Sequence, residues 1–259
     1  MATVKEIYDY FDAFAPFSTQ DSFDNSGLLV GKETDKVNKI AVCLDITNSI
    51  VQEAAELGAN LIISHHPVIF HKLAAVETDS VVANLIKRNM NAICIHTNLD
   101  MARGGISDIM LELLDFSGNE VFEVTDSEKG IGYGRIASLD FPSEARTVAE
   151  IAKKAFNCHV VRYFDSGKPI KRLAVVSGAG CSEQSLELAV KKECDAVLSG
   201  DIKHSVFVEA KNKNISVIDA GHFHTENIVC SMLVSMITTN FKDVEAFIPY
   251  SNKDVCRYV

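Results

Sequence analysis

The chain has 259 residues, of which 47% are hydrophobic and 23% are charged, as in ordinary globular proteins that form a sizeable core. Its formal net charge of −10 disfavours an interaction with the phosphate backbone of nucleic acids. The N-terminal residues lack the apolar segment of a signal peptide, and no run reaches the ~18 apolar residues of a membrane-spanning helix. We therefore expect a cytoplasmic protein that binds neither nucleic acid nor membranes.

The cysteines include no CxxC pair, and several lie inside apolar runs such as AVCLD and AICIH. This usage is typical of buried thiols in a reducing compartment, so we expect core residues rather than disulfides.

The first half of the chain alternates short apolar strands with amphipathic helices. Residues 24–31, DNSGLLVG, predict a turn that leads into a strand. Residues 39–67 predict a strand, a helix capped by Thr47, and a second strand that ends in the pair His65 and His66. The helical run SVVANLIKRNM, the strand AICIHTNLD and the helical run ISDIMLELLD complete this half.

Residues 118–170 predict a small α/β insert. It contains the strand GIGYGRIASLD, the helix SEARTVAEIAKKAF capped by Ser143, and the strand HVVRYF. No proline- or serine-rich linker flanks the insert, which indicates that the parts of the chain pack together.

The order of elements then repeats from Lys171. The strand KRLAVV, a helix capped by Ser182, the strand AVLSG, the helix SVFVEAKNKN, the strand ISVIDAGHFHTE and the helix NIVCSMLVSMI follow one another. Alternating strands and helices indicate mainly parallel sheets. We predict an α/β fold of two related, packed halves, residues 1–117 and 171–259, with residues 118–170 as the insert.

Polar residues of this pattern gather where strands end, which is where parallel α/β folds place their functional groups. Six of the eight histidines lie at the ends of four predicted strands, together with aspartate and glutamate. Packing does not explain this clustering, whereas histidine with carboxylates is the usual ligand set of Zn, Fe or Mn. The sequence therefore predicts a metal site and leaves the choice among these metals open.

The spacing assigns ligands to two divalent metal ions. Adjacent strand residues point to opposite faces, so we expect His65 and His66 to bind one ion each, with Asp100 as a bridge. Residues 222 and 226 share one helix face if a helix begins there, as in metal-binding helices. The predicted metal ligands are His65, His66, Asp100, His222 and Glu226.

Other polar residues at these strand ends have no ligand role in this scheme. His96 and His204 are the candidates for a catalytic role, by contacting the substrate or donating a proton. For Asp201 and His224 three positions stay open: beside a metal ligand, in the lining of the pocket, or on the protein surface. The run SGAG at 177–180 predicts a tight turn, with a phosphate-binding loop as the alternative.

The motifs DNSGLLVG, ISHHPVIF, HTNLD, SGAG, SGDIKH and GHFHTE, in this order, resemble the family of GTP cyclohydrolase I type 2 homologues, also called Nif-three-like dinuclear metal centre proteins. The resemblance runs from Asp24 to Glu226. It implies a toroidal homohexamer with two metal ions per subunit facing an internal cavity. It also implies the same five ligands, with His222 rather than His224 as the ligand from GHFHTE. The long insert of some bacterial members is absent here.

These features favour a metal-dependent hydrolase that acts on a nucleotide or another phosphorylated small molecule. Two cations ~3.5–4 Å apart activate water and polarise a substrate, and ring-opening of GTP is one such reaction. The alternative is a binding or delivery protein, in which the metals are cargo or anchor a ligand without turnover. A purely structural site is less favoured, because such sites often use cysteine and close with about four ligands.

Overall fold

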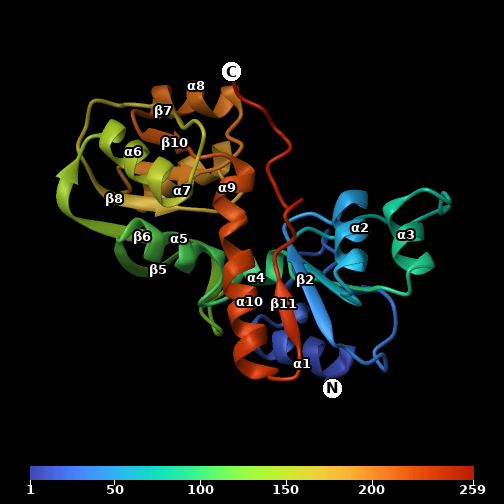
Figure 1. The fold of residues 1–259 in the computed structure, drawn as a ribbon. Helices are drawn as coiled ribbons and strands as arrows, with labels where there is room; N and C mark the ends of the chain where they lie inside the picture. Colours follow the sequence, from blue (N-terminus) through green and yellow to red (C-terminus); the bar gives the residue numbers. More distant parts are fainter. The chain divides into compact units, whose positions relative to one another are not determined.

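A computed structural model describes residues 1–259, which form two compact units. The first unit comprises Met1–Leu99 and Val229–Lys253, and the second comprises Asp100–Ile228 and Asp254–Val259. Each unit has its own sheet and helices, so the predicted α/β class is confirmed (Figure 1). The division into two related halves and an insert stays a prediction. No helix has the length and apolar character needed to cross a membrane.

The sheet of the first unit has the strand order β1-β4-β3-β2-β11. Its strands are β1 (Gly27–Val30), β2 (Lys39–Cys43), β3 (Leu61–Ser64), β4 (Asn91–Cys94) and β11 (Glu245–Phe247). All neighbouring pairs are parallel except β1 with β4. Strands β3 and β4 are buried at every position, which explains their continuous apolar sequences.

The helices of this unit include three that the sequence predicts, α2 (Asn48–Glu56), α3 (Val81–Lys87) and nearly all of α10 (Ile228–Asn240). The sequence was not used to predict the two N-terminal elements, α1 (Val4–Phe14) and the 3-10 turn η1 (Phe17–Thr19). The Thr47 hydroxyl accepts a hydrogen bond from the backbone N–H of Ile50, which confirms the predicted cap of α2. Helix α2 packs on a core that includes Ala41 and Ile62 of the central strands.

The sheet of the second unit has the strand order β5-β6-β8-β9-β10-β7. Its strands are β5 (Ser117–Asp126), β6 (Ile131–Ser143), β7 (Arg162–Phe164), β8 (Ile170–Val175), β9 (Ala196–Ser199) and β10 (Ser216–Asp219). The central strands β8, β9 and β10 are parallel, whereas β5, β6 and β7 run antiparallel to their neighbours. The strands of the predicted insert therefore form both edges of this sheet.

Two predicted helix caps of this unit have different outcomes. The helices are α5 (Ile106–Leu114), α6 (Ala145–Ala155), α7 (Glu183–Lys191), α8 (His204–Lys213) and α9 (His222–Glu226), and α4 (Thr97–Met101) ends here. Ser182 caps α7 with a complete capping box. The predicted cap at Ser143 is wrong, because β6 continues to this residue and pairs it with Ile170; Glu144 precedes α6 instead.

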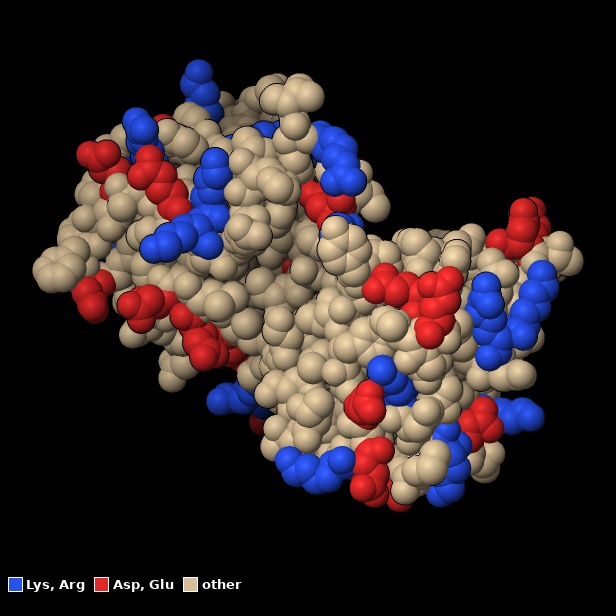
Figure 2. Space-filling model, viewed as in Figure 1, with Lys and Arg blue, Asp and Glu red and all other residues tan.

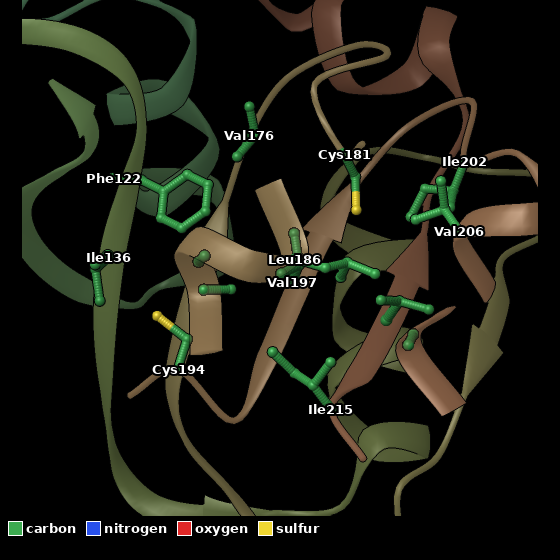
Figure 3. Close-up of a cluster of buried hydrophobic side chains, with 14 residues drawn as sticks. Phe122, Ile136, Val176, Cys181, Leu186, Cys194, Val197, Ile202, Val206 and Ile215 are labelled. Carbon is green, nitrogen blue, oxygen red and sulfur yellow. The ribbon is translucent and has the colours of Figure 1, made fainter. Parts of the chain in front are cut away.

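The core of the second unit anchors the turn that follows β8 (Figure 3). Val176 and Cys181, on either side of the SGAG run, both belong to this cluster, together with Leu186 and Val197. Burial raises the pKa of the Cys181 thiol to about 12, so this cysteine is an inert core residue. Six of the seven cysteines are buried as expected, and Cys256 is exposed.

Candidate metal centre

The adjacent pair His65 and His66 follows directly after β3, at the carboxyl end of the first sheet. The strand ends at Ser64, and the next two backbone N–H groups donate to the carbonyl groups of Cys43 and Leu44 in turn. Consecutive donations to one neighbour are not a strand pattern, so the chain bends here. The argument from strand alternation is therefore wrong in its premise, and the two rings lie 5.1 Å apart. Their assignment to different ions stays a prediction.

Both rings are held through Nδ1. The Nδ1 atom of His65 lies 2.9 Å from the carbonyl oxygen of Ile95, and that of His66 lies 2.8 Å from Asp45 Oδ1. Because these oxygens only accept hydrogen bonds, Nδ1 carries the proton in each ring and Nε2 is the nitrogen suited to a metal ion. Metal-binding histidines usually have such a second partner.

His96 joins this pair at the end of β4. Its Nδ1 lies 2.8 Å from Asp24 Oδ1, so Nδ1 again donates to an oxygen. The candidate ligand atoms of the three histidines lie within 4.8 Å of one another. We call His65, His66 and His96 the histidine group; within it, His96 can reach either a metal ion or a substrate.

The second unit contributes a group with negative charge. Helix α9 begins at His222, after Gly221 with φ of 82°, and brings His222 Nε2 to 2.9 Å from Glu226 Oε2. This confirms the predicted placement of both side chains on one helix face. Candidate ligand atoms of Asp100 and Glu226 lie within 4.8 Å of each other, and both residues are buried. We call Asp100, His222 and Glu226 the acidic group.

The SGAG turn packs directly on the acidic group. Ser177 Oγ donates to Asp100 Oδ1 over 2.8 Å, and the backbone N–H of Gly178 donates to Thr225 Oγ1 over 3.1 Å. Gly178 has φ of +51°, and a Cβ atom there would lie 1.9 Å from Glu226 Oε1. The tight-turn interpretation is confirmed, and glycine is needed because the Glu226 carboxylate occupies the space of a side chain.

Two aspartates organise the approach to α9. The Asp219 carboxylate accepts hydrogen bonds from the backbone N–H groups of Gly221 and Ile202, and it pairs with Arg162. Asp201 Oδ2 lies 3.7 Å from His222 Nδ1, which is longer than a hydrogen bond. Asp201, whose role the sequence left open, therefore lies beside a predicted ligand.

The remaining histidines lie in different surroundings. His224 is buried, which lowers its pKa, and its Nε2 lies 3.6 Å from an Asp254 carboxylate oxygen. A surface position, one of the alternatives for His224, is therefore excluded. His204 is the exposed first residue of α8 and belongs to neither ligand group. Its catalytic role stays a prediction.

Several residues of the site were not singled out from the sequence. Asp45 and Asp24 anchor histidines, and Ser177 holds a carboxylate ligand. Asp24 stands in DNSGLLVG, which predicted only a turn. The sequence offers one signal for Asp24, a carboxylate just before a predicted strand. It does not show which strand of the sheet lies next to that one.

The donor set of both groups fits a divalent transition-metal ion. Imidazole nitrogens and carboxylate oxygens suit Zn, Fe and Mn, and no cysteine belongs to either group. The acidic group also needs a positive charge, because two buried carboxylates close together repel each other. Surface carboxylates differ, because basic side chains compensate them, as Lys39 does for Glu245. On the face shown in Figure 2, acidic and basic side chains are interspersed.

An aromatic surface adjoins the histidine group. Phe70 follows the histidine pair, and its ring centroid lies 6.2 Å from that of His96. Phe23 lies 6.4 Å from Phe70 at an angle of 32°, and it is 60% exposed. Exposed aromatic side chains next to a polar site are suited to contact a flat, apolar ring.

Comparisons with known proteins agree with these features. A model of Duf34/NIF3 (NGG1p interacting factor 3) matches residues 2–254. A Clostridium acetobutylicum protein named GTP cyclohydrolase 1 type 2 homolog is 33% identical over 229 residues, 86% of this chain and 85% of the relative. A Helicobacter pylori protein named GTP cyclohydrolase 1 type 2 is 32% identical over 231 residues, 87% of this chain and 88% of the relative.

Solved structures share the fold over nearly the whole chain. Reduced HcgD from Methanocaldococcus jannaschii aligns with a TM-score of 0.82 at 27% identity and covers 96% of this chain and 98% of its own. A hypothetical protein of Staphylococcus aureus aligns with a TM-score of 0.87 at 26% identity and covers 99% of both chains.

Proposed function

Because the chain belongs to the Duf34/NIF3 family, we propose that it is a metal-dependent hydrolase with two divalent cations per subunit. The proposed ligands, as the sequence predicts, are His65, His66, Asp100, His222 and Glu226. The observation that carries it is the complementary make-up of the groups. One offers imidazoles whose Nδ1 atoms are hydrogen-bonded to oxygens, and the other offers two buried carboxylates.

Neither group by itself completes the roughly four-ligand shell of a closed structural zinc site, which favours open positions for water and substrate. When bound, the cations would supply Lewis-acid chemistry that polarises a substrate oxygen and acidifies water. The chain supplies the rest. Asp100 and Glu226 provide compensating negative charge, and His96 moves a proton between water and the leaving group.

The substrate class in this proposal is a nucleotide or another phosphorylated small molecule. The exposed pair Phe23 and Phe70 supports a flat heteroaromatic ring beside the histidine group. The relatives named GTP cyclohydrolase 1 type 2 are consistent with such a ring. From the family resemblance we also propose a homohexamer, which light scattering on the purified protein tests directly.

The test is metal content and turnover on matched variants. The purified protein is loaded with Zn, Fe or Mn, its metal content is measured, and a panel of nucleotides and phosphomonoesters is assayed for phosphate and formate release. We expect two metal ions per subunit, and we expect Glu226→Gln and His65→Asn each to lower the metal content and to abolish turnover. Unchanged metal content in either variant would contradict the role of that residue as a ligand. Full loading without turnover on the panel would favour the binding or delivery function instead.

A further inference from the structure

Asp24, in the loop before β1, is a fully buried carboxylate to which the proposed mechanism gives no role. Its side chain is 0% exposed. It accepts five hydrogen bonds, from His96 Nδ1, the N–H and hydroxyl of Thr97, the Ser26 hydroxyl and the backbone N–H of Asn25. A buried carboxylate is costly unless it is fully hydrogen-bonded, so this arrangement indicates that the anion itself is required.

The Asp24 carboxyl is ionised in the folded protein. Burial alone would raise its pKa, but the hydrogen bonds from His96 and Thr97 outweigh burial and hold the pKa below its usual range. An ionised carboxylate only accepts hydrogen bonds. Each of the five donors therefore keeps its proton, and the proton on the His96 ring is fixed at Nδ1.

This arrangement determines what His96 presents to the histidine group. The His96 ring lies 5.0 Å from the ring of His65 and 5.5 Å from that of His66. With Nδ1 turned to Asp24, the nitrogen that meets a ligand of this group is Nε2, and in the neutral ring Nε2 carries a lone pair.

We infer that Asp24 is a positioning residue that fixes the ring of His96 and places its proton on Nδ1, so that Nε2 faces the reacting atoms. The use of Nε2 in proton transfer rests on the proposed hydrolase function, whereas the placement of the ring and its proton does not. Asp24 itself touches neither the metal ligands nor the substrate in this scheme.

A purely structural role for Asp24 is the competing explanation. The loop has other ties that do not involve this carboxylate: Asn25 Nδ2 donates to the carbonyl oxygen of Ile69 over 2.6 Å, and the Asp21 backbone N–H donates to Thr97 Oγ1 over 3.0 Å. The bond between Asp24 and His96 is therefore not needed merely to close the loop.

The experiment uses ¹⁵N NMR of the metal-free full-length protein at pH 8, where imidazoles are mostly neutral. In the wild type we expect the His96 ring to show a protonated Nδ1 and an unprotonated Nε2. Asp24→Asn places an amide that can both donate and accept, so we expect a mixture of the two neutral ring forms. Thr97→Val removes another donor to the same carboxylate and should leave the His96 signal unchanged.

The result that would overturn the inference is a wild-type His96 protonated at Nε2, which can be read even if Asp24→Asn does not fold. A variant that folds and keeps the wild-type His96 signal would overturn it equally. If turnover is found, Asp24→Asn should lower kcat at least tenfold with metal content unchanged, and it should add little in the His96→Asn background. The expected ring form without any turnover would leave this inference standing and reject the proposed hydrolase.

Discussion

The two ligand groups differ in charge and in how the protein holds their atoms. The histidine group lies in bends after two buried strands, and each imidazole is oriented by one oxygen, from Ile95, Asp45 or Asp24. In the acidic group Asp100 also accepts one hydrogen bond, from Ser177, but Glu226 is held by close packing, because a glycine turn leaves no space beside it. The comparison teaches that orientation comes from single hydrogen bonds in the histidine group and from steric fit at Glu226. Substitutions around the two groups should therefore fail in different ways.

The largest effect is expected where steric fit is broken. In Gly178→Ala the new methyl group would lie 1.9 Å from Glu226 Oε1 and 3.2 Å from His222 Nε2, so the Glu226 side chain must move. We expect metal affinity, measured by competition with a chelating dye, to fall at least ~100-fold, the upper end for residues that support metal ligands.

The matched control is Gly167→Ala in the same unit. Gly167 also has a left-handed backbone, with φ of +77°, but a Cβ atom there meets nothing within 4 Å. Both variants should lose about 1 kcal/mol of unfolding free energy from backbone strain. Equal metal affinities of the two variants would refute the steric explanation.

A smaller effect is expected where one hydrogen bond orients a ligand. Asp45→Asn weakens the hold on His66 Nδ1, and the Asp45 side chain is 56% exposed, so water partly replaces it. We expect metal affinity to fall about tenfold, the lower end for such partners. Asp79→Asn, at an exposed aspartate of the same unit, is the control and should have no effect. A loss as large as that of Gly178→Ala would show that the first unit is as sensitive as the second.

The smallest effects concern the unfolding free energy of the metal-free protein, which two substitutions should change in opposite directions. Glu226→Gln removes one of two buried carboxylates whose oxygens lie within 4.8 Å, so we expect unfolding free energy in EDTA to rise by roughly 1 kcal/mol. His66→Asn removes the ring and its hydrogen bond to Asp45, so the same quantity should fall by about 1 kcal/mol. Denaturant titration of both variants measures the contrast, and destabilisation by Glu226→Gln would contradict it.

Local sequence patterns were sufficient for most of the helices and strands. Buried parallel strands read as apolar runs, and the caps at Thr47 and Ser182 carry their signal in adjacent residues. The pairing of His222 with Glu226 also followed from helix periodicity alone. These features depend on neighbours within a few positions, which a single sequence displays.

Features that depend on distant pairing were not predictable. The cap at Ser143 failed because its β pairing with Ile170 extends the strand. The predicted orientation of His65 and His66 had a wrong premise, because these residues lie in a bend after the strand and not in the strand itself. A role for Asp24 was not predicted, because its partner His96 follows a different strand. The sequence does not show which strand ends are neighbours in the sheet.

The strand order of the first sheet also has a consequence for synthesis of the chain. Glu245 of β11 pairs with Lys39 of β2, although nearly the whole sequence separates them. On the ribosome, every strand of the second sheet has emerged while the β2 edge of the first sheet is still uncovered. Synthesis proceeds at about 5–20 residues per second, so the nascent chain exposes that unpaired strand edge for on the order of ten seconds. Unpaired edges promote aggregation, so this edge is a site where a chaperone would protect the chain.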